Sequence, residues 1–143
     1  MTELSDGLLD TSVVVHALGN DADTSAAQAF LSRIEAGELQ VIVDPIVVNE
    51  LIYVLSRFTR EFSRDRIADV ALSMLDISGT STLDATVRRA IVVWRDAPGL
   101  SFVDAYLGVR AELENLPVYT VNRKDFLRQG VDAPDLRELM GTG

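Results

Sequence analysis

The sequence predicts an α/β domain built on a parallel sheet, and three observations support this fold class. Short apolar or β-branched runs alternate with longer amphipathic stretches, no internal repeat or linker interrupts them, and 143 residues suit one domain. Strands that alternate with helices specify a parallel sheet covered by helices. We therefore expect a single domain over residues 1–143, with a central sheet of about four to five parallel strands and helices on both faces.

The first strand and the first two helices follow from turn and cap residues near the N-terminus. Leu8 and Leu9 form a short apolar run that leads directly into Asp10-Thr11-Ser12, a group typical of a helix start. Residues 23–36 carry apolar side chains at the helical period, and Gly37 ends that stretch. This region is predicted to be a strand followed by two helices.

The middle of the chain repeats the pattern with stronger signals. Residues 41–43 are β-branched and end at Asp44-Pro45, which combines an N-cap with proline at the first helical position. Ser63 is expected to begin another amphipathic helix, and residues 75–78 are expected to form a short strand.

The C-terminal third is predicted to contain the last strand and four helical segments. Residues 82–94 are amphipathic, and Ser101 is a cap residue for a helix that continues to about Glu114. Residues 116–121 read as a strand, followed by a short turn or helix at 123–128 and a last helix at 134–140.

Composition excludes several classes of chemistry. The chain has no cysteine and one histidine, His16, which excludes thiolate nucleophiles, cysteine-ligated zinc and a histidine-rich metal site. Its formal net charge of −9 disfavours unselective adhesion to nucleic acid. No apolar run approaches the roughly 18 residues needed to cross a bilayer, so a cytoplasmic location is expected.

Acidic side chains follow the expected strands at the points where those strands end. Asp10 comes after the first strand, Glu50 lies on the helix after the second, Asp104 lies on the helix that begins at residue 101, and Asn122 and Asp125 follow the last. Ligands of open α/β sheets collect at the carboxyl ends of the strands, so these side chains are expected to share one rim. Oxygen ligands without Cys or His favour Mg²⁺ or Mn²⁺, as one or two ions.

Each carboxylate also has a purely structural interpretation. Asp10 and Asp125 can cap helices, Asp104 can form a capping box with Ser101, and Glu50 can be a solvated surface residue. These separate explanations do not account for the convergence of the carboxylates. Carboxylates placed together repel one another, which raises some of their pKa values unless a cation offsets the charge.

Four segments in order carry a resemblance to a known family. They are Leu9–Val15 (LDTSVVV), Val48–Leu51 (VNEL), Ser101–Leu107 (SFVDAYL) and Thr120–Phe126 (TVNRKDF). In order, spacing and total length they resemble the motifs of the PIN domain, and especially those of VapC-like toxins of toxin–antitoxin pairs. The resemblance covers nearly the whole chain.

This resemblance implies a metal-dependent endoribonuclease that cleaves cellular RNA, forms a homodimer and is silenced by a cognate antitoxin. Asp10 and Asp104 are the expected direct ligands of one or two Mg²⁺ or Mn²⁺ ions. Glu50 is expected to ligate a second ion or to accept a proton from water. Asn122 and Asp125 are the two candidates for the fourth position, and Asp125, acting through water, is the favoured one, with Asn122 as a positioning group.

Further residues are assigned supporting roles. Hydroxyl groups expected to orient ligands or phosphate oxygens are those of Thr11, Ser12 and Thr120. Candidate RNA contacts are Arg123 and Lys124 beside the fourth motif, and Arg57, Arg60, Arg64 and Arg66 near one helix end. A solvated surface paired with Glu61 and Asp65 explains the second group equally well. His16 is explained better by packing or exposure than by catalysis.

Three other functions remain open at this point. A non-catalytic acidic α/β module, such as a phospho-acceptor signalling domain, would need an acceptor Asp after the third strand, and none is obvious. The same fold could serve as a housekeeping RNA-processing nuclease without an antitoxin. It could also be a degenerate homologue that only binds RNA or protein.

Overall fold

A computed structural model describes residues 5–58, 62–77, 80–81 and 85–141. The chain forms two compact units, Met1–Arg88 and Arg89–Gly143, and each is described by itself. Helices predominate, and the strands that are present belong to the first unit, so the fold is of the predicted α/β class. A single domain over residues 1–143 stays a prediction.

The strands and helices of the described residues follow one another in an order close to the one that the sequence indicates. The strands are β1 (Gly7–Leu8), β2 (Val41–Ile42) and β3 (Thr80–Ser81). The helices are α1 (Thr11–Leu18), α2 (Thr24–Glu35), α3 (Pro45–Phe58), α4 (Arg64–Asp76), α5 (Thr86–Asp96), α6 (Phe102–Glu114), α7 (Arg123–Leu127) and α8 (Leu136–Leu139). Among the described residues, none of these helices is long and apolar enough to cross a membrane.

The sheet of the first unit is parallel, with β2 between β1 and β3. Gly7 lies opposite Val41 across one ladder, and Val41 lies opposite Thr80 across the other. The ladder with β1 continues past Leu8, because the N–H of Leu9 donates to the carbonyl of Ile42 at 3.1 Å. A parallel ladder of this kind brings the ends of β1 and β2, and so the starts of α1 and α3, to the same edge of the sheet.

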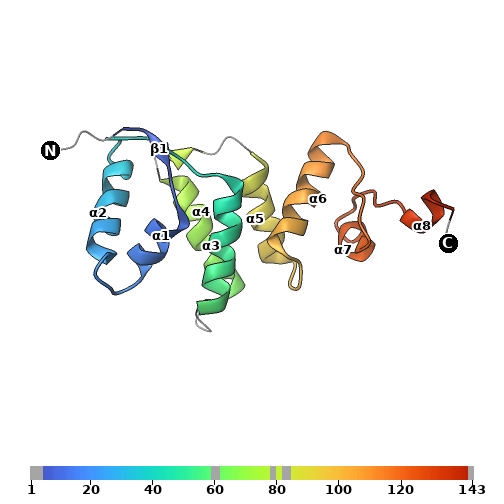
Figure 1. The fold of residues 1–143 in the computed structure, drawn as a ribbon, viewed down its shortest axis with the longest axis horizontal. Coiled ribbons are helices and arrows are strands. Elements are labelled where there is room, and N and C mark those ends of the chain that lie inside the picture. Colours follow the sequence, from blue (N-terminus) through green and yellow to red (C-terminus); the bar gives the residue numbers. More distant parts are fainter. Residues whose placement is uncertain (1–4, 59–61, 78–79, 82–84, 142–143) are drawn as a thin grey trace. The chain divides into compact units, whose positions relative to one another are not determined.

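Helix packing in the first unit follows the apolar periodicity. Helix α1 packs against α2 and α3, and α3 packs against α4 (Figure 1). Ile34, Leu51 and Ala71 are completely buried in this unit, as their positions on the predicted apolar faces indicate. Burial of these apolar faces fixes the orientation of α1 and α3, and therefore the directions in which their first turns point.

Helix starts are the features that the sequence predicts best. A side-chain oxygen accepts an N–H two or three residues further on at Asp10, Asp44, Ser63 and Ser101. Each such cap satisfies a main-chain donor that the first turn leaves unpaired, and stabilises the helix by about 1 kcal/mol. The predicted caps of α1, α3, α4 and α6 are thereby confirmed.

The prediction of a strand at residues 116–121 is wrong. These residues have no regular secondary structure and no place in a sheet ladder of the described chain. Pro117 has no N–H to donate, and the N–H of Val118 donates instead to the carbonyl of Asp132 at 2.8 Å. The Val118 side chain packs against a small core, whereas Val121 is 94% exposed.

The expected strand at residues 75–78 is also corrected. Helix α4 continues through Asp76, because Met74 and Leu75 complete its buried apolar face. The third strand follows later, at Thr80–Ser81, whereas residues 78–79 and the expected helix start at 82–84 lie outside the described residues. In the part of the chain that the structure describes, the sheet therefore has three strands rather than four to five.

Candidate functional site

Asp10 is an exposed carboxylate just beyond the carboxyl end of β1. Its Oδ2 accepts a hydrogen bond from the Ser12 hydroxyl at 2.5 Å and from the Ser12 N–H at 3.2 Å. The Ser12 hydroxyl is the main cause that lowers the pKa of Asp10 below its ordinary value, and the Ser12 N–H contributes next. Asp10 is therefore ionised at neutral pH, and Ser12 holds its carboxylate through two hydrogen bonds, while the supporting role of Ser12 in a metal site stays a prediction.

Glu50 belongs to a helix whose first turn is tied to the start of α1. Thr11 is 3% exposed, and its hydroxyl donates to the carbonyl of Val47 at 3.2 Å. Glu50 lies one turn beyond Val47 on α3 and is exposed. The Thr11 hydroxyl thus joins the two helices that carry Asp10 and Glu50, and in this structure it donates to the protein main chain.

In the second unit, Asp104 and Asp125 are joined through a third residue, Gln129. The Gln129 Nε2 donates to the Asp104 carbonyl at 3.2 Å and to the Asp125 carbonyl at 3.1 Å. These two acidic residues lie 21 positions apart on different helices, and both are partly buried. The structure therefore brings the third and fourth motifs together within this unit.

The two candidates for the fourth acidic position form one hydrogen-bonded pair. The Asn122 Nδ2 donates to the Asp125 Oδ2 at 2.7 Å, and an Arg128 nitrogen lies 3.8 Å from the other oxygen. The Thr120 hydroxyl oxygen accepts the Asn122 N–H at 2.9 Å, which fixes the turn before α7. This geometry suits the expected role of Asn122 as a positioning group for Asp125, and both roles stay predictions.

The basic candidates differ in whether their charged groups contact other residues of the protein. Arg123 donates to the carbonyl of Ala133 at 2.7 Å and pairs with Asp135 at 3.4 Å, so its guanidinium holds the C-terminal segment of the unit. Arg57 donates to the Tyr53 hydroxyl and lies over the ring of the same tyrosine. Lys124 is exposed beside the fourth motif.

Two further basic candidates lie near the start of α4 in the sequence. Arg66 lies 4.5 Å from the centre of the Phe62 ring. The predicted RNA contact Arg60 lies outside the described residues. All the basic candidates keep their RNA-binding roles as predictions, and Lys124 is an exposed candidate within the fourth motif.

Sequence reasoning missed a second group of possible ligands around His16. The ligand atoms of His16, Asp21 and Asp23 lie within 4.8 Å of one another, and the His16 Nδ1 lies 2.7 Å from the Asp21 Oδ2. The other Asp21 oxygen accepts the Asp23 N–H at 2.8 Å, which is the main cause that lowers the pKa of Asp21. One imidazole and two carboxylates could hold a transition metal. The only sequence signal was the Asp-x-Asp spacing soon after the histidine.

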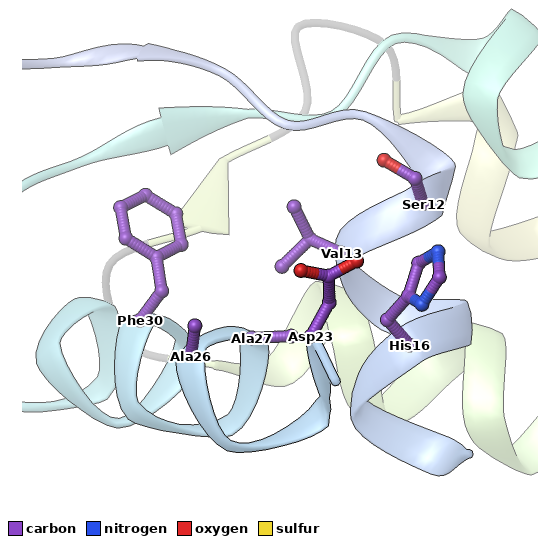
Figure 2. Close-up of a pocket in the computed structure, with 7 residues that line it drawn as sticks. All are labelled: Ser12, Val13, His16, Asp23, Ala26, Ala27 and Phe30. Carbon is purple, nitrogen blue, oxygen red and sulfur yellow. The ribbon is translucent and has the colours of Figure 1, made fainter. Parts of the chain in front are cut away.

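A pocket of about 470 Å³ adjoins this group. Figure 2 shows its lining side chains, which come from α1 (Ser12, Val13 and His16), from Asp23 just before α2, and from α2 itself (Ala26, Ala27 and Phe30). Ser12, which contacts Asp10, and Val13 both belong to the first motif, so this motif lines part of the pocket. The lining is mostly apolar away from His16 and Asp23.

Comparison with known families identifies one match. The model of the PIN domain matches residues 7–131, which include all four acidic motifs. No curated protein matches the chain.

Proposed function

Because the chain belongs to the PIN domain family, we propose that it is an endoribonuclease which uses Mg²⁺ or Mn²⁺ to hydrolyse RNA phosphodiester bonds. PIN domains are generally nucleases. The proposal further assigns the chain to the VapC-like toxins, with a cognate antitoxin and a homodimeric state. One observation carries it, namely the family match over residues 7–131, because the matched span contains each of the four acidic motifs.

The donor set fits a hard divalent cation. Asp10 is exposed and its pKa lies below the ordinary value, so it presents a charged oxygen ligand at neutral pH. Glu50, Asp104 and Asp125 likewise offer carboxylate oxygens rather than thiolate or imidazole, and oxygen ligands are those that Mg²⁺ and Mn²⁺ prefer. One or two ions, when bound, would lower the pKa of water and offset charge on the phosphate.

The protein's own groups then have separate tasks. Ser12 keeps the Asp10 carboxylate in one orientation, and Asn122 does the same for Asp125 through its 2.7 Å hydrogen bond. Glu50 is exposed and can take up the proton that an attacking water loses. Lys124 would contact a phosphate of the RNA beside the fourth motif.

Metal dependence provides the direct test. Purified protein incubated with mixed RNA is expected to produce fragments in Mg²⁺ or Mn²⁺, and none in excess EDTA. Addition of Mn²⁺ beyond the EDTA concentration should restore cleavage. Fragments that persist in EDTA would contradict the metal role, and intact RNA under all conditions would favour a module that only binds.

The toxin assignment predicts a phenotype in cells. Inducible expression of the wild-type chain is expected to arrest growth and fragment RNA, whereas Asp104→Ala at equal protein level should do neither. Growth curves and total RNA on gels measure the two effects. Normal growth with active purified enzyme would favour a housekeeping nuclease, and arrest by both chains would contradict the role of Asp104.

A further inference from the structure

We propose that Gln129 is a positioning residue of the metal site, and that Gly108 is required because any side chain there would displace the Gln129 amide. The inference rests on the proposed function, because it assigns metal binding to Asp104 and Asp125. Its basis is the contact by which one amide group holds the main chains of both residues.

The amide of Gln129 connects α6 with the end of α7. Its Nε2 carries two hydrogens, and it lies 3.2 Å from the Asp104 carbonyl oxygen and 3.1 Å from that of Asp125. The main-chain N–H of Gln129 donates elsewhere, to the carbonyl of Phe126 at 3.0 Å. The Gln129 side chain therefore donates a hydrogen bond to the Asp125 carbonyl of α7, which the main-chain N–H of Gln129 does not reach.

Gly108 provides the space in which this amide lies. It is buried one turn after Asp104 on α6, and a Cβ at this position would be 2.1 Å from the Gln129 Oε1 and 2.6 Å from its Cδ. Glycine within a helix is unfavourable compared with alanine. The close approach of the Gln129 amide gives a physical reason for glycine at this position.

The consequence for the site is a fixed separation between α6 and the residue that carries the fourth carboxylate. Asp125 also receives the Asn122 amide on its side-chain oxygen, so both its main chain and its carboxylate are held. Partners that hold metal ligands in place typically change metal affinity by tenfold or more when they are removed. Gln129 is thus expected to hold the main chain of Asp125, and Asn122 is expected to hold its carboxylate.

Three variants of the full chain test the inference, with Mn²⁺ as the probe. In Gln129→Met the amide is lost, and in Gly108→Ala it is displaced while Gln129 remains. The control is Gln28→Met, because the Gln28 amide also donates to a main-chain carbonyl, that of Ala17 at 2.9 Å, in the other unit. Free Mn²⁺ measured by electron paramagnetic resonance gives the affinity, and RNA cleavage against Mn²⁺ concentration gives the half-maximal point.

Both test variants are expected to bind Mn²⁺ about tenfold more weakly than the wild-type chain. Cleavage at saturating Mn²⁺ should stay near the wild-type rate, and Gln28→Met should match the wild-type chain throughout. Gly108→Ala should lower the melting temperature only slightly, because the helix preference of alanine offsets part of the loss of the two Gln129 hydrogen bonds. A merely structural role would lower the melting temperature and leave Mn²⁺ affinity unchanged.

The possible outcomes separate this inference from the proposed function. Wild-type affinity in folded Gly108→Ala or Gln129→Met would overturn the positioning role alone. If the wild-type chain itself bound no Mn²⁺, both the proposed function and the inference would be overturned. The double variant should bind no more weakly than either single variant, since both changes remove the same contact.

Discussion

Asp10→Asn is expected to reduce RNA cleavage by at least about a hundredfold and to leave the fold intact. The substitution removes the negative charge that the Ser12 hydrogen bonds stabilise, so the position loses its value as a cation ligand. Asparagine is as good an N-cap as aspartate, and it can still accept the Ser12 N–H. Initial rates in Mg²⁺ and thermal midpoints of the two proteins would measure these effects.

Asp44→Asn is the matched control for this experiment. Asp44 is also an exposed N-cap that follows a strand of the same sheet, and its Oδ1 accepts the Ile46 N–H at 2.9 Å. We expect Asp44→Asn to cleave RNA at the wild-type rate. Equal loss in both variants would attribute the effect to capping or charge in general, and full activity of Asp10→Asn would remove Asp10 from the site.

The helix starts and the buried faces could be predicted from the sequence because they depend on local interactions. A cap bond joins residues two or three positions apart, as at Asp10 and Ser101, so the residue type and its neighbours suffice to place it. The hydrogen bond between Asn122 and Asp125 is equally local, but the roles of these two residues in the site stay predictions that rest on the family resemblance. Residue pattern alone was sufficient for the helix starts and the buried faces.

Features that depend on distant partners could not be predicted in this way. Residues 116–121 have the composition of a strand, but strand formation needs a neighbouring ladder, and Val118 instead pairs with Asp132. The Gln129 amide reaches a carbonyl 25 residues away, and glutamine carries no sequence signal for such a contact. His16 was expected to be packed or exposed, and its partner Asp21 became evident only in three dimensions.

Phe126→Ala is expected to lower the free energy of unfolding by about 3–5 kcal/mol. Phe126 is 2% exposed and is the largest side chain in a core cluster of the second unit, whose other members are Ala111, Val131 and Ala133. The neighbouring members are small, so they are poorly able to fill the space that the ring leaves. Such a loss is a large part of the 5–15 kcal/mol that stabilises a typical domain. Urea unfolding curves would measure it.

Two variants show whether the effect comes from this core. Leu127→Ala changes the next residue of α7, which is 50% exposed, and should cost within about 0.5 kcal/mol as for other surface positions. Phe126→Leu keeps much of the volume and should cost less than alanine does. Because Asp125 precedes Phe126 on the same short helix, Phe126→Ala should also weaken Mn²⁺ binding, whereas Leu127→Ala should not. Equal stability of the Phe126 and Leu127 alanine variants would contradict the packing of α7 onto this core.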